Sequence, residues 1–304
     1  AYTAFLRRPG VRMLSNSKFG ARDYEDWLGV GRGAVQVIYN WCEFAGLRAR
    51  TSPQAAAGAR AEAGIPPEAI VVGGVMRCSF EKRPELWTEI ACELAGRDPR
   101  VYGILVGDGP MRPRLIRHVE QLGFADRIRF VGRRSPVEPW MQAMDLLFLS
   151  SMTEGLPNVL IEAQSLGLAV ATMRVGGAPE TVLEGRSAVI IDEAPAARIA
   201  DAIGTLLFDR ARLRAYGKTG AGWASRMFSV EAMLDRLLML YGEDAGEGGK
   251  RGAAVPRMRL DGIAAAVTPT DQRWRPATSR FRHWTRIVRP SAAQRDGVRG
   301  GDVQ

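Results

Sequence analysis

The segment DLLFLSSMTEGLPNVLIEAQSL, residues 145–166, indicates how most of the chain folds. Its apolar run Leu146–Leu149 is typical of a buried strand, and the Ser150-Ser151 pair breaks that run. A helix is expected from Pro157 to Leu166, because proline suits a first helical position, whose N–H has no partner inside the helix. The segment therefore predicts a strand, a loop and a helix in succession.

The same succession repeats along the chain. Strands are expected at Ile70–Val75, Val101–Val106, Ile128–Val131, Asp145–Leu149, Leu168–Thr172 and Ala188–Ile191. Helices are expected at about 84–94, 112–122, 136–144, 157–166 and 179–183, followed by 196–208, 210–225 and 229–241. Apolar strands separated by helices are typical of a parallel sheet covered on both faces, so the predicted fold class is α/β with a Rossmann-like sheet. Ligands of such sheets bind outside the carboxyl ends of the strands.

The N-terminal part of the chain predicts a smaller strand–helix–strand unit. Strands are expected at Val11–Leu14 and Val35–Tyr39, and the helix between them is expected to be capped by Ser15 or Ser17 and to end at Gly29. The stretch from 40 to 67 is rich in Ala, Gly and Pro, and is expected to be a connector with one short helix around 53–63.

The composition is that of a globular protein, with 46% hydrophobic and 25% charged residues. No apolar run reaches the length of about 20 residues that a membrane-spanning helix needs, and no secretory signal opens the chain. Cys42, Cys78 and Cys92 are odd in number and lack metal-ligand spacing, so a reduced, cytoplasmic protein is expected. The first residue is Ala1, which leaves a processed start and a fragment both open.

The net charge of +9 is unevenly distributed. Residues 243–304 contain 12 Lys and Arg against 7 Asp and Glu, a balance of +5, so the remainder carries only +4. Few aliphatic residues occur there, which predicts a basic, largely disordered tail that is typically solvated and without a fixed role. Its aromatic residues stand among arginines, which leaves open a contact with a membrane surface or nucleic acid. Of the two we expect peripheral contact at the inner face of a membrane, and no nucleic acid. These tail residues are Trp274, Phe281 and Trp284, with Arg273, Arg275, Arg280, Arg282 and Arg286.

Two glutamates follow the strand at 145–149. Glu154 lies in the loop and Glu162 in the helix, so both can face one pocket from different heights. A carboxylate that accepts two hydroxyl groups orients a sugar, and the backbone N–H groups around Gly155 to Asn158 open a helix N-terminus that suits phosphate oxygens. A solvated loop glutamate and a second one favoured by the helix dipole explain the same residues without a ligand. The spacing alone leaves both interpretations open.

Two cations follow the strand at 70–75. Arg77 and Lys82 come after Gly73-Gly74 and before a helix, which suits a diphosphate. A solvated cationic loop fits equally well. At another strand end the turn Val175–Glu180 contains Gly176-Gly177, where a backbone without side chains either approaches a ligand closely or simply turns.

The sequence lacks the residue patterns that several other kinds of catalytic or binding site need. The chain has two histidines, His118 and His283, and His118 falls within a predicted helix, where solvation or packing is the expected role. The segment Gly107-Asp108-Gly109-Pro110 is expected to be a turn and a helix entry. The sequence contains no Asp-x-Asp pair, Walker loop, Gly-x-Ser-x-Gly elbow or Gly-x-Gly-x-x-Gly fingerprint.

Five motifs, taken in order, resemble the retaining glycosyltransferases of family 4, which have the two-domain GT-B fold. They are Gly74–Pro84 with Arg77 and Lys82, Val106–Pro110, Phe130–Arg133, the E-x7-E segment Glu154–Glu162, and Val175–Glu180. The motifs span about 70–185, and a looser likeness extends over about 11–241. The resemblance implies that the chain is mainly the C-terminal, donor-binding half of such an enzyme. Residues 1–40 would be the remnant of an N-terminal acceptor domain, 41–242 a Rossmann-like nucleotide-sugar-binding domain, and 243–304 the tail.

The resemblance also implies roles for individual residues. Arg77 and Lys82 would bind the donor diphosphate, Glu154 the transferred sugar and Glu162 the ribose hydroxyls. The other donor-binding positions would be Gly155, Leu156, Pro157, Asn158, Gly176 and Gly177, with Val131, Gly132 and Arg133 beside the nucleobase. The implied reaction is the transfer of a sugar from a UDP- or GDP-sugar to an acceptor hydroxyl with retained anomeric configuration. It would serve polysaccharide or glycoconjugate synthesis and would need neither a cofactor nor a metal ion.

The sequence departs from the family in its N-terminal part. Ser15-Asn16 and Ile38–Asn40 resemble the end of the family's N-terminal domain and its hinge, yet only about 40 residues precede the hinge. The absent part normally supplies the acceptor site. The alternative is therefore a non-catalytic nucleotide-sugar-binding half that needs a separate N-terminal domain. The last helix, at about Ser229–Tyr241, resembles the one that packs against that domain, and it is expected to expose apolar side chains. A GT-B epimerase would need acid and base side chains that these turns lack.

Overall fold

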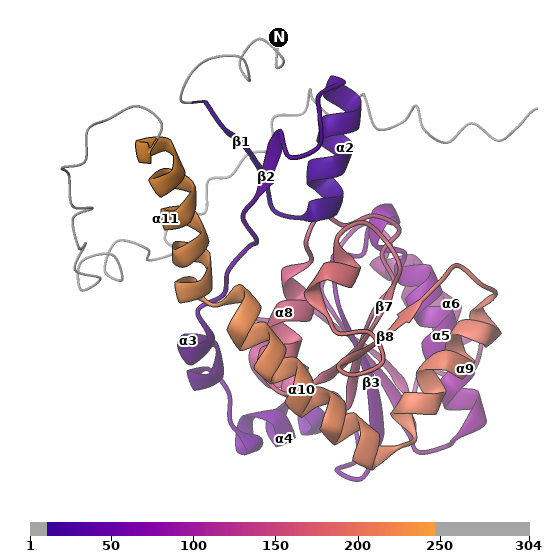
Figure 1. The fold of residues 1–304 in the computed structure, drawn as a ribbon. Coiled ribbons are helices and arrows are strands. Elements are labelled where there is room, and N and C mark those ends of the chain that lie inside the picture. Colours follow the sequence, from indigo (N-terminus) through magenta and orange to yellow (C-terminus); the bar gives the residue numbers. More distant parts are fainter. Residues whose placement is uncertain (1–10, 247–304) are drawn as a thin grey trace, which may run out of the picture. The chain divides into compact units, whose positions relative to one another are not determined.

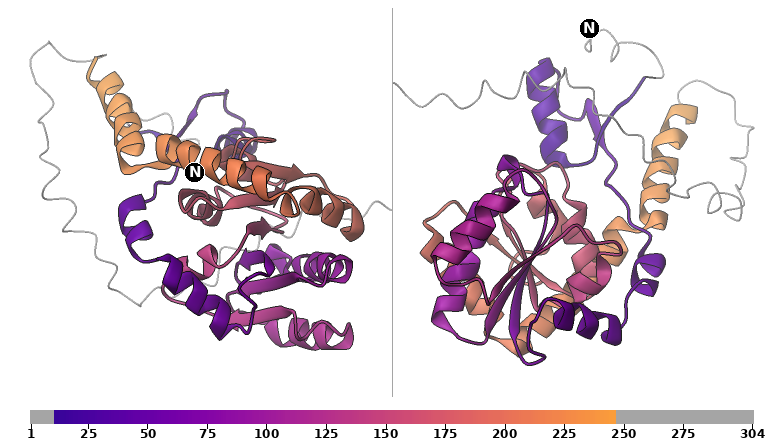
Figure 2. Two further views of the ribbon diagram at one scale, coloured as in Figure 1. Left: turned by 90° about the horizontal axis from the view of Figure 1, so that it is seen from below. Right: turned by 180° about the vertical axis from the view of Figure 1, so that it is seen from behind.

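A computed structural model describes residues 11–246, which contain a six-stranded parallel sheet with helices on both faces (Figures 1 and 2). The strand order is β5-β4-β3-β6-β7-β8. The first strand of this sheet in the sequence, β3, therefore lies in the middle, with β4 and β5 on one side of it and β6, β7 and β8 on the other. The bounds are β3 (Ile70–Val75), β4 (Val101–Val106), β5 (Ile128–Gly132), β6 (Leu146–Leu149), β7 (Ala169–Met173) and β8 (Ala188–Ile191). The predicted α/β Rossmann-like fold is confirmed, and β3, β4 and β8 have the predicted bounds.

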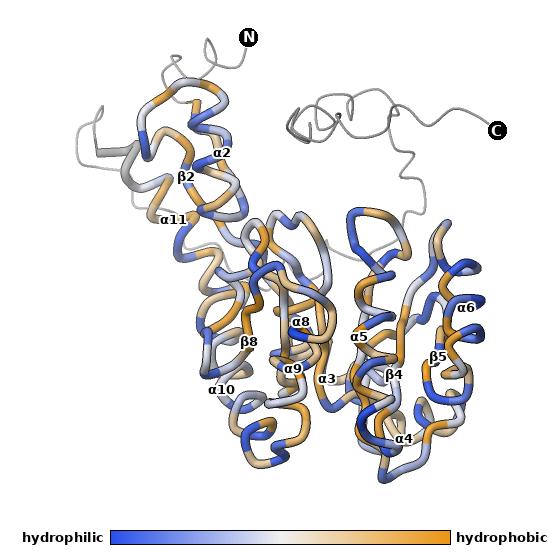
Figure 3. Tube along the Cα trace, turned by 90° about the vertical axis from the view of Figure 1, so that its right-hand side faces the viewer, coloured by the Kyte–Doolittle hydropathy of each residue, from blue (hydrophilic) through white to orange (hydrophobic). Residues whose placement is uncertain are grey.

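Two hydrophobic clusters fill the space between the sheet and its helices. On one face the core packs against α5 (Pro84–Arg97), α6 (Arg112–Gln121) and α9 (Ala196–Leu207), and it includes the fully buried Trp87. On the other face it packs against α4 (Pro53–Glu62), α7 (Glu138–Gln142) and α8 (Asn158–Ser165). In Figure 3 the covering helices α5 and α6 alternate between hydrophilic and hydrophobic residues, as expected for helices with one solvated face.

The N-terminal unit has β1 (Met13–Ser15) and β2 (Val35–Val37) as a separate parallel pair, with α2 (Lys18–Leu28) between them. Both strands are shorter than expected, whereas the helix ends are as predicted. The Ser17 hydroxyl accepts the Gly20 N–H, and Gly29 ends the helix in the left-handed region with φ +65°.

The long C-terminal helices pass from the sheet toward the N-terminal unit. They are α10 (Arg210–Phe228) and α11 (Val230–Gly246), and α11 runs beyond its expected end. A third cluster joins Tyr39 and Phe44 to Ile161 of α8 and Phe228 of α10. Side chains of α11 are exposed as predicted, with Leu238 55% and Met239 68% accessible. No helix within residues 11–246 is long and apolar enough to cross a membrane.

Three local predictions are wrong. The expected connector contains α3 (Phe44–Ala49), whose first N–H groups are accepted by the Glu43 carboxylate. Pro157 is not the first residue of α8 but its extended N-terminal cap, because its carbonyl accepts the Leu160 N–H at 3.2 Å. The helix expected at 179–183 is a single 3₁₀ turn, η2 (Ala178–Thr181). The predictions for residues 1–10 and for the basic tail beyond 246 fall outside the described residues.

Candidate functional site

The loops that follow β3 and β4 run against each other at the carboxyl edge of the sheet. The Met76 N–H donates to the Val106 carbonyl and the Cys78 N–H donates to the Asp108 carbonyl, both at 3.0 Å. A Cβ atom on Gly107, at φ +135°, would lie 1.8 Å from the Met76 carbonyl oxygen. Gly107 is therefore required for the close approach of the two loops, which goes beyond the plain turn that the sequence predicts.

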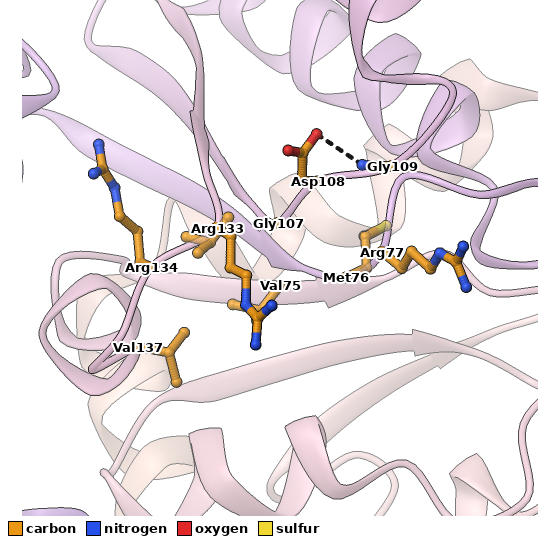
Figure 4. A pocket seen from close by; sticks show the side chains of 10 residues that line it. Val75, Met76, Arg77, Gly107, Asp108, Gly109, Arg133, Arg134 and Val137 are labelled. Carbon is orange, nitrogen blue, oxygen red and sulfur yellow. Dashed lines mark hydrogen bonds between the residues drawn. The ribbon is translucent and has the colours of Figure 1, made fainter. Parts of the chain in front are cut away.

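A pocket of about 760 Å³ opens beside these loops (Figure 4). Its lining comes from the ends of β3, β4 and β5: Val75, Met76, Arg77, Val106, Gly107, Asp108, Gly109, Arg133, Arg134 and Val137. Arg134 is held by an ion pair with Glu62 at 2.7 Å and by the ring of Trp140 at 4.7 Å. Arg77 and Arg133 are exposed and form no ion pair within residues 11–246, so they keep their charge available to an anion.

The predicted cation Lys82, in the loop after β3, is in direct contact with the predicted carboxylate Glu154, in the loop after β6. The Lys82 ammonium donates to Oε1 of Glu154 at 2.7 Å, and the Ser151 hydroxyl donates to the same oxygen at 2.6 Å. The Ser150 hydroxyl contacts the Lys82 and Arg83 carbonyls at 2.8 and 3.0 Å. The loops after β3 and β6 are thus joined by both side chains and backbone, although they lie far apart in the sequence.

The glycine turn after β7 packs on the backbone of the Glu154 loop. Gly176 has φ +52°, and a Cβ atom there would lie 1.8 Å from the Glu154 carbonyl oxygen. The Gly177 N–H donates to that carbonyl at 3.2 Å, and a Cβ atom on Gly177 would lie 1.9 Å from the Gly155 carbonyl oxygen. The turn therefore supports the loop directly.

Glu162 lies on α8, half-buried, in a region with two other charged groups. Burial raises the pKa of its carboxyl group first, the neighbouring Glu138 raises it further, and Arg50 acts in the opposite direction. Glu138 is itself buried and accepts from Arg50 Nε at 2.7 Å. Burial, with Glu162 nearby, also raises the pKa of the Cys42 thiol to about 11, so this cysteine is not an activated nucleophile.

The remaining predicted site residues differ in what they contact. Leu156 is buried in the third hydrophobic cluster, so its side chain serves packing. Asn158 accepts from the Asn40 amide at 2.8 Å, which links the predicted hinge to the start of α8. Val131 packs on the core, and the Gly132 carbonyl accepts the Gly107 N–H at 2.9 Å. The side chains of Leu156 and Val131 thus serve packing, whereas Asn158 is exposed and uses only its Oδ1 atom in this hydrogen bond.

The sequence pattern does not single out Glu180, which links two parts of the fold. The Glu180 carboxylate, in η2, accepts the backbone N–H groups of Lys18 and Phe19 at 2.8 Å each and the Tyr39 hydroxyl at 3.0 Å. It joins the N-terminal unit to the glycine turn. The only signal available from sequence is its place at the end of the Val175–Glu180 motif. Among the described residues, no three His, Cys, Asp or Glu side chains gather in a way that could hold a metal ion.

Residues 67–209 match the family model "Glycosyl transferases group 1". A Vi polysaccharide biosynthesis protein, VipC/TviE of Salmonella typhi, is 36% identical over 64% of this chain and 33% of its own length. A D-inositol 3-phosphate glycosyltransferase of Nocardia farcinica is 32% identical over 79% of this chain and 56% of its own length. The chain thus spans about a third to just over half of the length of these two curated relatives.

Solved structures show the same architecture. HepE of Anabaena, in complex with UDP and glucose, superposes with a TM-score of 0.68 and 25% identity, over 76% of this chain and 63% of that one. A glycosyltransferase of Rickettsia africae superposes with a TM-score of 0.70 and 18% identity, over 79% and 65% of the two chains, which supports the fold alone. Residues 67–209 are therefore similar to the group 1 glycosyl transferases, and the sheet has the Rossmann-like fold of the GT-B glycosyltransferases.

Proposed function

We propose that the chain is the donor-binding half of a retaining glycosyltransferase that takes its sugar from a UDP- or GDP-sugar and transfers it to an acceptor hydroxyl. Polysaccharide or glycoconjugate synthesis is the proposed setting, in keeping with the names of the relatives. The acceptor would meet the donor at the carboxyl edge of the sheet. A cytoplasmic location, with peripheral membrane contact through the basic tail, belongs to the same proposal.

One observation carries this proposal: four loops with complementary chemistry lie packed together at that edge. The loop after β3 supplies Arg77 and Lys82, the loop after β6 supplies Glu154, and the glycine turns after β4 and β7 support them from either side. Parallel sheets bind their ligands there. The cation and carboxylate pattern suits a diphosphate with a sugar attached.

The chemistry proposed for the site rests on positioning and charge. Arg77 and Lys82 would neutralise the diphosphate, which stabilises the leaving group as the glycosidic bond to it breaks. Glu154 would hold the sugar hydroxyls, and Glu162 the ribose hydroxyls. Retention would follow from attack on the same face, with the leaving phosphate oxygen accepting the proton of the acceptor hydroxyl. Holding both reactants in line would supply much of the rate.

Calorimetric titration of the full chain with UDP and GDP tests the proposal. One of the two nucleotides is expected to bind, and Glu162→Ala is expected to weaken that binding at least tenfold, because the ribose loses its acceptor. Glu120→Ala, an exposed position on α6, is the matched control and is expected to change nothing. Absence of binding by either nucleotide at millimolar concentration, or unchanged affinity in Glu162→Ala, would refute the proposal.

A second candidate is a nucleotide-sugar-binding half that acts only with an N-terminal domain supplied by another chain. The exposed apolar side chains of α11 favour it. Sugar transfer by the isolated chain, at the rate of a complete enzyme, would rule out this candidate.

A further inference from the structure

The two hydrogen bonds that Glu154 accepts both reach the same oxygen. Ser151 Oγ and Lys82 Nζ lie 2.6 and 2.7 Å from Oε1. Oε2 accepts no hydrogen bond within residues 11–246. The carboxylate is therefore held from one side, and its second oxygen remains available to a ligand.

The two donors differ in how firmly the fold holds them. Ser151 is fully buried at the end of β6, where the Met152 N–H donates to the Glu81 carbonyl at 3.0 Å and fixes the local backbone. Lys82 reaches Glu154 with a flexible four-carbon chain, and its side chain is 27% exposed. The serine hydroxyl is shielded from solvent and donates to Glu154, whereas the ammonium group can turn toward solvent or toward a bound anion.

A bound diphosphate would compete for the ammonium group. It carries more negative charge than one carboxylate, so Lys82 would move from Glu154 toward the phosphate oxygens. The Glu154 side chain, only 9% exposed, would then retain Ser151 as its one hydrogen-bond donor. A carboxylate without any fixed donor would turn freely and would bind a sugar hydroxyl poorly.

We propose that Ser151 is a positioning residue that holds Glu154 toward the transferred sugar once Lys82 has left Glu154 for the donor diphosphate. This inference rests on the proposed function. It assigns Lys82 to the diphosphate and the Ser151–Glu154 pair to the sugar, so the hydroxyl of Ser151 matters for a nucleotide sugar and not for the nucleotide alone.

The test compares each nucleotide with its sugar derivative by calorimetry on the full chain: UDP with UDP-glucose and UDP-N-acetylglucosamine, and GDP with GDP-mannose. In the wild type, one sugar derivative is expected to bind more tightly than its nucleotide. Ser151→Ala is expected to weaken that derivative about five- to tenfold and to change the affinity for the bare nucleotide less than about twofold. Glu154→Gln is expected to show the same selectivity, and adding Ser151→Ala to it is expected to cost little more.

The matched control is Ser150→Ala, which removes an equally buried hydroxyl that contacts the Lys82 and Arg83 carbonyls instead of Glu154. It is expected to weaken the nucleotide and its sugar derivative by the same factor. Equal weakening of both ligands in Ser151→Ala, additive losses in the double variant, or no gain from a sugar in the wild type would each overturn the inference. Absence of any nucleotide binding in the wild type would overturn the proposed function as well, and the same titrations distinguish these results.

Discussion

Replacement of Gly176 by alanine tests whether the glycine turn supports the Glu154 loop. The backbone at Gly176 has φ +52°, a region where a side chain costs about 1–2 kcal/mol. The added Cβ atom would also lie 1.8 Å from the Glu154 carbonyl oxygen, a distance that forces the backbone to move. Overpacking of this kind costs about 1–3 kcal/mol more. The expected loss of unfolding free energy is therefore about 2–5 kcal/mol.

Gly185 is the matched control for this substitution. Its φ is +71°, so alanine meets the same backbone strain, but nothing lies within 4 Å of the added Cβ atom. Gly185→Ala is expected to cost only the strain, about 1–2 kcal/mol, and to leave nucleotide-sugar binding unchanged. Gly176→Ala is expected to weaken that binding at least tenfold, because it displaces the backbone of the loop that carries Glu154.

Urea denaturation gives the two stabilities, and calorimetry with the nucleotide sugar gives the two affinities. The difference between the variants isolates the close approach from the strain. Equal stability losses in both variants, or wild-type affinity in a folded Gly176→Ala variant, would refute the idea that the turn positions the loop.

Three further predictions concern single side chains. Lys82→Met is expected to weaken UDP or GDP binding about 10- to 100-fold in calorimetry, because the variant loses a charge-assisted hydrogen bond to the ligand. Adding Glu154→Gln to this variant is expected to recover stability but not affinity. Recovered affinity would mean that Lys82 has only a structural role. Glu162→Gln is expected to raise the denaturation midpoint at pH 7. The raised pKa of Glu162 means that its ionised carboxylate destabilises the folded state at that pH, and the neutral amide removes this destabilisation. That gain should shrink as the pH falls toward the ordinary glutamate value of 4.5, and a gain that grows on acidification would contradict the direction of the shift. Trp87→Phe removes the 3.1 Å hydrogen bond from the buried indole to a β3 carbonyl and is expected to cost about 1–3 kcal/mol in urea denaturation, whereas an unchanged midpoint would show that this bond contributes nothing.

The strands were predictable because most of them are short runs of apolar residues. β3 and β4 are buried along nearly their whole length, which is the burial that such a run implies. The positions of Arg77 and Glu154 followed as well, since residues just after parallel strands must lie at one edge of the sheet. The order of the strands in the sheet could not be predicted, because the apolar pattern of a strand does not indicate which other strand pairs with it.

Contacts between segments that lie far apart in the sequence could not be predicted from the sequence pattern. Arg50 and Glu138 lie 88 positions apart, and Glu180 contacts Lys18 across 162 positions. Nothing in the local composition of either partner indicates the other. Helix α3 was missed for a different reason: its cap is a glutamate rather than the more usual serine, threonine, aspartate or asparagine, and it is only six residues long.

A crystal structure of the full chain with its nucleotide sugar is the most direct measurement of the central claim. We predict that the diphosphate lies between Arg77 and Lys82, the ribose at Glu162, and the sugar against Glu154, with Ser151 still bonded to that carboxylate. A nucleotide bound away from the carboxyl edge of the sheet, or one bound there with Lys82 still paired to Glu154 and no contact to Arg77, would contradict it.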